Sequence, residues 1–356
     1  MKINSRISAV TMSAVTMSAV TMSVALMTGA LLATGALAQQ APPVPAKPAT
    51  EKSVQISGAA VGQFAHFVSI GWARTIAKIS GYRAAPVASS GMIENVQLVV
   101  QNKTEFGWVS GLIFDDSRNG DSSIINKAEL DKVRGAFGLP AGAHHIIVLA
   151  GSPIKRLEDL AGKRISGFGR GSLGWPYVAE VLGAVGIKKG GYREEPLGPS
   201  QAVQALKEGK VDVVYGTGNP PNSSVVELGA THKFRLIAIP PEVLAKLVQR
   251  APSWQSGVVP KGVYANMENG GTDIPTIQQT MIAATSTAVD ADTVYAATYA
   301  IMENLNEFWA SHPGAKFLTL ETGLDGMPVP LHAGALRYFR AKGIPVPARL
   351  VPPEAK

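Results

Sequence analysis

The Gly169–Gly174 segment has the residue types and spacing of an anion-binding loop. Its sequence, Gly-Arg-Gly-Ser-Leu-Gly, fits the G-x-G-x-x-G pattern and lies between an expected strand and an expected helix. Glu194 follows about 20 residues later, where a ribose-binding acid stands in dinucleotide sites. The backbone N–H groups of a helix start would also hold a carboxylate or phosphate. A tight turn that needs glycine for packing is the third interpretation.

Arg170 within this loop offers specific anion chemistry, because a guanidinium can pair with a carboxylate through two hydrogen bonds. The alternative is an arginine that points outward into solvent. Two tryptophans, Trp108 and Trp175, could line a binding pocket, although an aromatic residue at a strand end or helix start is as often part of the core.

Catalytic and metal-binding constellations are weak. Ser172 is preceded at the second position by Arg170 instead of the glycine of a nucleophile elbow. The neighbours His144 and His145 stand at an expected strand entry, where successive side chains point to opposite faces, so they cannot easily share a metal. The chain has no cysteine, which excludes disulfides and thiolate metal sites. We expect no cofactor, no metal and no enzymatic activity; a transferase that uses the glycine loop is the enzymatic alternative.

The first 38 residues resemble a secretory signal peptide. Lys2 and Arg6 are the only charged residues before an apolar run that ends in Ala36-Leu37-Ala38. This pattern predicts cleavage after Ala38 and a periplasmic protein, with an uncleaved membrane anchor as the alternative. Export to a compartment without nicotinamide cofactors disfavours the dinucleotide interpretation. Without a cysteine at the cleavage point, we expect no lipid anchor on the mature chain.

Composition sets the broad class. The 356 residues predict about two domains. The 33 Lys and Arg residues exceed the 26 Asp and Glu residues, which gives a net charge of +7, or about +5 without the leader. With 46% hydrophobic and 17% charged residues, the chain is neither disordered nor basic enough to indicate a nucleic-acid-binding protein. Residues 39–52 hold four prolines and predict a flexible tether.

From Ser53 onward short apolar strands alternate with amphipathic helices, which predicts an α/β architecture with mainly parallel sheets. We expect strands at Val54–Ile56, Ala84–Ala88, Phe106–Val109, Ile146–Ala150, Arg164–Phe168, Val211–Tyr215, Arg235–Ile239 and Gln279–Thr285. The three- and four-residue spacing of apolar residues predicts helices over Phe64–Ile79, Met92–Gln101, Trp175–Val185, Ser200–Glu208, Ser223–Ala230 and 291–310, and a short helix from Ser152 to Leu160. Pro240–Pro260 should form a crossing back to the first domain.

A series of short motifs occurs in the order typical of one family. They include the segments Ser57–Phe64, Ser90–Asn95, Phe106–Val109, Ser152–Gly174, Gly218–Asn222, Asp273–Thr276 and Leu324–Phe339. The chain resembles the TAXI family of solute receptors, the extracytoplasmic binding proteins of tripartite ATP-independent periplasmic (TRAP) transporters. The resemblance covers nearly all of residues 53–345.

The resemblance implies a bilobed α/β periplasmic-binding-protein fold of class II type, with a hinge and a ligand in the cleft. Lobe one would combine residues 53–148 with 251–356, and lobe two would take 149–250. The implied ligand-binding residues are Gly58, Ala59, Ala60, Gly62, Phe64, Ser89, Ser90, Gly91, Asn95, Trp108 and Ser110 of lobe one and Arg170, Gly171, Ser172, Leu173, Gly174, Gly216, Thr217, Gly218 and Asn219 of lobe two.

The ligand implied is a small organic anion or amino acid, glutamate-like or dicarboxylate-like, and the partner implied is a TRAP permease. We expect a monomer that binds no nucleic acid. A periplasmic sensor that feeds a histidine kinase is the alternative on the same fold. The family's first loop is usually richer in glycine, whereas Ala59-Ala60 and Phe64–Phe67 stand here, so the pocket should be narrower and less polar.

Overall fold

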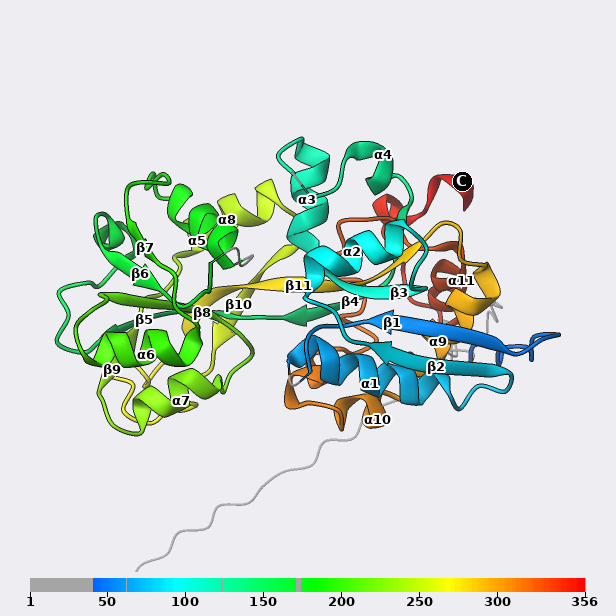
Figure 1. Cartoon of the computed structure of the whole chain (residues 1–356), viewed down its shortest axis with the longest axis horizontal. Helices are drawn as coiled ribbons and strands as arrows, with labels where there is room; N and C mark the ends of the chain where they lie inside the picture. The colour runs from blue at the N-terminus through cyan, green and yellow to red at the C-terminus, as the bar shows by residue number, and fades with distance from the viewer. Residues whose placement is uncertain (1–40, 62, 123, 171–173, 356) are drawn as a thin grey trace, which may run out of the picture. The chain divides into compact units, whose positions relative to one another are not determined.

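The computed structural model describes residues 41–61, 63–122, 124–170 and 174–355 (Figure 1). The expected signal peptide therefore lies outside the described residues, as do Gly62, Gly171, Ser172 and Leu173. Within the described ranges, every helix is too short or too polar to cross a membrane. Residues 39–356 form one compact unit.

Lobe one is built on a six-stranded sheet. Five strands follow the order β10 (Trp254–Val259), β11 (Ile274–Ser286), β3 (Phe106–Ser110), β1 (Lys52–Ser57) and β2 (Tyr82–Val87), and β4 (Val133–Ala141) also pairs with β11. The strand β1 runs parallel to β2 and β3, whereas β11 runs antiparallel to β3, β4 and β10.

The helices of lobe one cover both faces of this sheet, with α1 on one side and α2 on the other (Figure 1). They are α1 (Phe64–Ile76), α2 (Met92–Val100), α3 (Gly111–Asn119), α4 (Lys127–Leu130), α9 (Ala291–Met302), α10 (Leu305–Trp309) and α11 (Ala333–Ala341), with 3₁₀ turns at Pro313–Phe317, Ala348–Leu350 and Pro353–Ala355. In α1 the buried residues Val68, Trp72 and Ile76 recur every four positions, which places one apolar stripe on the sheet.

Lobe two is a smaller sheet between two layers of helices. Its strands follow the order β7 (Arg193–Glu195), β6 (Arg164–Ser166), β8 (Val213–Thr217), β5 (His144–Leu149) and β9 (Phe234–Leu236). The helices α5 (Gly174–Gly183) and α8 (Pro241–Arg250) enclose one core with the 3₁₀ turn Leu157–Leu160, and α6 (Pro199–Lys207) and α7 (Ser223–Gly229) enclose another.

The prediction of mainly parallel sheets is wrong, because both sheets are mixed. In lobe two β6 runs parallel to β7 and β8, but β5 runs antiparallel to β8 and β9. The antiparallel strands are those by which the chain passes between lobes: it leaves lobe one through β4 into β5 and returns through β10 and β11. Helical crossovers within a lobe give parallel neighbouring strands, whereas the strands that connect the two lobes run antiparallel to their neighbours.

The crossing strands also place the lobe boundaries differently from the expected residues 148 and 250. Strand β5, from His144, already belongs to the second sheet. On the return, Trp254 and Ile277 pack in the core of lobe two, whereas Met281 and Ile282 pack in the core of lobe one. The thirteen-residue β11 therefore belongs to both lobes and changes from one to the other near Gln279.

Two local expectations need correction. The helix predicted over 291–310 begins as expected, with the Asp290 side chain accepting a hydrogen bond from the Thr293 N–H at 2.9 Å. The helix ends after Met302. The Asn304 side-chain nitrogen donates a hydrogen bond of 2.8 Å to the Ala300 carbonyl, which would otherwise accept from the Asn304 backbone N–H if the helix continued.

The described part of the proline-rich segment 41–51 forms no helix or strand but packs on the fold. Pro42 is buried, and the Tyr295 hydroxyl donates to the Pro43 carbonyl at 2.6 Å. This segment leads directly into β1 at Lys52.

Candidate functional site

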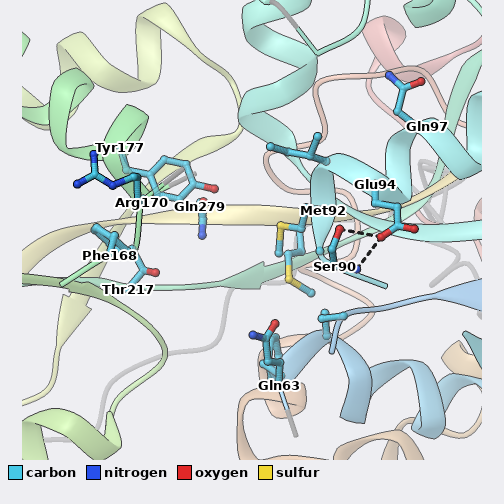
Figure 2. A pocket seen from close by; sticks show the side chains of 17 residues that line it. Gln63, Ser90, Met92, Glu94, Gln97, Phe168, Arg170, Tyr177, Thr217 and Gln279 are labelled. Carbon is cyan, nitrogen blue, oxygen red and sulfur yellow. Dashed lines mark hydrogen bonds between the residues drawn. The ribbon is translucent and has the colours of Figure 1, made fainter. Parts of the chain in front are cut away.

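A cavity of about 810 Å³ is lined by residues of both lobes. Figure 2 shows Phe168, Arg170, Tyr177 and Thr217 on one side and Ser90, Glu94 and Gln97 on the other. The remaining labelled residues are Gln63 and Met92 of lobe one and Gln279 of β11. A cavity of this size suits a small organic molecule.

The wall from lobe one is held by a buried asparagine. The Asn95 amide nitrogen donates to the carbonyls of Gly58 at 2.6 Å and Trp108 at 2.7 Å, and its oxygen accepts from the Ser89 hydroxyl at 2.6 Å. Gly58 and Ser89 lie just after the strands β1 and β2, and Trp108 is the middle residue of β3. Asn95 therefore ties two strand-end loops to β3 behind the cavity surface and acts as a positioning residue.

Ser90 and Glu94 form the polar rim of the same wall. One carboxylate oxygen of Glu94 accepts from the Ser90 N–H at 2.6 Å and from the Ser90 hydroxyl at 2.7 Å. These hydrogen bonds, the backbone one first, lower the pKa of Glu94. Glu94 is therefore an anion that orders the start of α2.

Apolar side chains occupy much of the lobe-one wall. Phe64, Met92 and Ile93 line the cavity, together with the small residues Ala59 and Ala65. The Phe64 ring lies edge-on to the His312 ring, with 4.8 Å between centroids. This wall offers contact to a hydrocarbon stem and carries few charges.

The wall from lobe two carries a cation and aromatic rings. Arg170 is exposed at the cavity and makes no salt bridge with another residue of the described ranges. The Trp175 indole donates to the Gly169 carbonyl at 3.2 Å, so Trp175 braces the glycine loop. A Cβ at position 174 would overlap the Phe168 ring, so the glycine there is needed for packing.

Tyr177 joins the two walls. Its hydroxyl lies 2.8 Å from the Ser110 hydroxyl at the start of α3 in lobe one. Burial raises the pKa of Tyr177 to about 12, and hydrogen bonds from Ser110 and Gln279 act against that rise. The phenol therefore stays protonated at neutral pH.

The two neighbouring histidines point to opposite faces of β5, as the strand geometry predicts. His144 Nδ1 lies 2.6 Å from the Tyr215 hydroxyl, and His145 Nε2 lies 2.8 Å from the Tyr264 hydroxyl. Burial lowers the pKa of His144 to about 3 and of His145 to about 4, so both are neutral. Among the described residues no group of three or more His, Cys, Asp or Glu side chains could hold a metal.

Apart from Trp108, the expected site residues that the structure describes fall into two groups. Those that line the cavity are Ala59, Phe64, Ser90, Gly91, Arg170, Gly174 and Thr217. Those behind its surface, or away from it, are Gly58, Ala60, Ser89, Asn95, Ser110, Gly216, Gly218 and Asn219. Gly216 lines a separate cavity of about 140 Å³ in lobe two, and the Asn219 side chain accepts from the Gly142 N–H at 3.2 Å.

Trp108 does not wall the cavity. Its ring is fully buried in lobe one, 5.6 Å from the Trp72 ring and 5.7 Å from the Phe137 ring by centroids. Trp108 is therefore a core residue, which was the alternative to a pocket residue, because β3 is buried along its whole length between α1 and α2. The carbonyl of Trp108, not its ring, serves the site by accepting from Asn95.

Several cavity residues were not anticipated: Ala65, Met92, Ile93, Glu94, Gln97, Phe168, Tyr177, Gln279 and Met281. Gln63 also lines the cavity and lies within the expected segment Gly58–Phe64. Helical spacing could have indicated Tyr177, which lies one turn after Gly174. Gln279 and Met281 alternate along β11 and so share a face, but their exposure to the cavity depends on where the lobes meet.

Two α/β lobes that share crossing strands and enclose a cavity of this size have the architecture of an extracytoplasmic solute-binding protein. A model of the NMT1-like family matches residues 59–343. The chain therefore belongs to this family, the TAXI-type solute-binding proteins of TRAP transporters, and the resemblance seen in the sequence is confirmed.

Solved structures with similar folds include binding proteins from several bacteria. A TctC solute-binding protein from Polaromonas is 14% identical, with a TM-score of 0.49, over 84% of this chain and 98% of that chain. The aliphatic sulphonate-binding protein SsuA from Escherichia coli is 14% identical, with a TM-score of 0.42, over 85% and 91%. The second substrate-binding domain of GlnP from Lactococcus lactis is 13% identical, with a TM-score of 0.40, over 77% and 97%.

Proposed function

We propose that this protein captures a small organic anion or amino acid, glutamate-like or dicarboxylate-like, and delivers it to a TRAP-type permease. The observation that supports an anionic ligand is Arg170, which lines the cavity and has no carboxylate partner among the described residues. An arginine at this position can bind a ligand carboxylate by donating two hydrogen bonds to it.

The rest of the lining suits the body of such a ligand. Phe64, Phe168 and Met92 offer apolar contact to a short methylene chain, and Thr217 and Gln63 offer neutral hydrogen-bonding groups. Glu94, on the other wall, would repel a second carboxylate placed near it and attract an ammonium group. The cavity thus has a cationic side and an anionic side, as an amino acid has.

The protein would bind its solute without turnover. Tyr177 keeps its proton at neutral pH, and one oxygen of Glu94 already accepts two hydrogen bonds from Ser90. We place the mature protein in the periplasm as a monomer, after cleavage behind Ala38.

Calorimetry on the mature chain tests the proposal with L-glutamate, L-glutamine, succinate, glutarate and 2-oxoglutarate. We expect one saturable site for at least one of these carboxylates, and an affinity about tenfold or more lower in Arg170→Ala. Arg193→Ala, which removes an exposed arginine of β7 in the same lobe, is the matched control and should bind normally. No binding of any carboxylate would overturn the proposal, and equal affinity in Arg170→Ala would remove Arg170 from the site.

A further inference from the structure

The middle of β11 presents a buried amide to the cavity. Gln279 is only 8% exposed and lines the cavity beside Tyr177 (Figure 2). Its side-chain oxygen is fully buried and has no hydrogen-bond partner among the described residues. Leaving such an acceptor unpaired is unfavourable, and buried polar groups in proteins nearly always find a partner.

The nitrogen of this amide is oriented by its surroundings. The side-chain nitrogen of Gln279 is the atom of this amide that lies nearest to Gly142, in the turn between β4 and β5. The same nitrogen lies 2.9 Å from where a Cβ of Gly142 would stand, so the absence of a side chain at Gly142 leaves room for it. With the nitrogen on this side, the oxygen is the atom left without a partner; it is closed off from the cavity in this structure, so a rotation of the amide is needed to bring it to a ligand donor.

We propose that Gln279 determines specificity by accepting a hydrogen bond from an ammonium or hydroxyl group of the ligand. This inference rests on the proposed function and narrows it: Arg170 takes the carboxylate, and Gln279 selects an amino or hydroxy acid over a plain dicarboxylate. The donor-free dicarboxylate would leave the Gln279 oxygen unpaired in the closed complex, and that loss is what discriminates against it.

Calorimetry with three probes of similar length tests this role: L-glutamate, 2-hydroxyglutarate and glutarate. The first two carry a donor beside one carboxylate, and glutarate does not. We expect the wild-type protein to prefer both donor-bearing probes over glutarate by about tenfold or more. Gln279→Met keeps the side-chain length and removes the acceptor, so the preference should shrink to within about threefold while glutarate affinity stays the same.

Gln278→Met is the matched control, because it makes the same change at the next residue of β11, on the opposite face of the strand. It should keep the wild-type preference. The urea midpoint of ligand-free Gln279→Met should equal or exceed that of the wild type, since an unpaired buried oxygen is removed. A purely structural Gln279 would instead lower the midpoint and weaken all three probes equally.

The outcomes separate the inference from the proposed function. If all three probes bind the wild type with equal affinity, the role of Gln279 is refuted and the carboxylate receptor stands. If glutarate is preferred, Gln279 does not select a donor. If none of the probes and no other carboxylate binds, both proposals are overturned. Gln279→Glu, which keeps an acceptor at this position, should retain binding of L-glutamate; loss of that binding in a folded variant would contradict the inference.

Discussion

The two walls of the cavity are held in place by different chemistry. Behind the lobe-one wall a neutral amide, Asn95, joins two loops to strand β3 through hydrogen bonds. Behind the lobe-two wall the buried His144 lies among the rings of Tyr177, Tyr215 and Trp254, at centroid distances of 5.1 to 5.6 Å. An amide does not titrate and an imidazole does, so the two walls should respond differently to pH.

The largest expected effect is the acid sensitivity of lobe two. The pKa of His144 and His145 is about 3 and about 4 in the folded protein, below the ordinary 6.5, so the unfolded chain binds protons first as pH falls. Stability is therefore lost from about pH 6.5 downward, by about 2 kcal/mol for each histidine between pH 7 and pH 5.

Urea unfolding at pH 7, 6 and 5 measures this loss. His144→Gln and His145→Gln should each flatten the pH dependence by about 2 kcal/mol, and Asn306→Ala, which changes an exposed residue of α10 that does not titrate, should leave it unchanged. Burial also lowers the pKa of His312 and His332 in lobe one, so the comparison is between variants and not with the wild-type slope alone. Identical slopes in all variants would contradict the difference between the walls.

Removing the Asn95 hydrogen bonds of lobe one should destabilise the protein nearly as much as acid does through the two histidines together, but by the same amount at every pH. Asn95→Ala leaves the Ser89 hydroxyl and two carbonyls without their partner, which should lower the free energy of unfolding by about 3 kcal/mol. Asn306→Ala, at an exposed position of α10, should change it by less than about 0.5 kcal/mol. The same urea series reports both values. A loss that grows as pH falls from 7 to 5 would contradict the claim that a group that does not titrate holds this wall in place.

A smaller effect is expected where the lobes join. Gly142 has a φ of +78°, between β4 and β5, so Gly142→Ala should cost about 1–2 kcal/mol of strain. Because the new Cβ would also press on the Gln279 amide, solute affinity should fall. Gly209 also has a positive φ, +67°, but no atom lies near the Cβ that Gly209→Ala would add. This control variant should therefore show the strain without the loss of solute affinity. Equal losses of solute affinity in the two variants would show that the effect of Gly142→Ala does not act through Gln279.

The smallest effect concerns an ionic cluster that links α3 to lobe two. Arg250 lies 2.7 Å from Glu180, 3.5 Å from Asp121 and 4.0 Å from Asp116. Burial raises the pKa of Asp116 to about 6, so the folded protein binds this proton more tightly than the unfolded chain, and this contribution to stability falls as pH rises from about 4 to 6.

Asp116→Asn removes that penalty and should stabilise the protein at pH 7 by no more than about 1 kcal/mol, because solvent and Arg250 screen the site. The difference between wild type and variant should vanish at pH 4. A variant that is less stable at pH 7 would show that the Arg250 ion pair outweighs burial of the carboxylate.

Local patterns in the sequence were sufficient for most helices, but not for elements that depend on distant partners. Strand β4 escaped prediction because Gly135, Gly138 and Pro140 are poor strand formers. It forms because β11 pairs with it along eight residue positions, from Gln279 with Ala141 to Ser286 with Val133. A Cβ at Gly135 would overlap Met327, so close packing explains the glycine at this position of the strand.

The same distinction applies to the candidate site. The loops that bring Ala59, Ser90 and Arg170 to the cavity follow strands, and small residues at strand ends are visible in the sequence. Gln279 was not predictable, because a mid-strand residue reaches the cavity only through the packing of one lobe on the other. Tyr177 could be indicated only by its position one helical turn after Gly174. Trp108 shows the converse: it was expected at a strand end, but it is the middle residue of β3 and stays in the core because this strand is buried along its whole length.

The most direct test of a solute receptor is mass spectrometry of the exported protein under conditions that keep it folded. We expect the wild-type protein to carry, or to gain on addition of L-glutamate, the mass of one small carboxylic acid, which denaturation releases. Arg170→Ala should carry none at the same concentration. A wild-type protein that shows no bound mass with any amino acid or dicarboxylate would contradict the assignment of this cavity as the binding site of an organic anion.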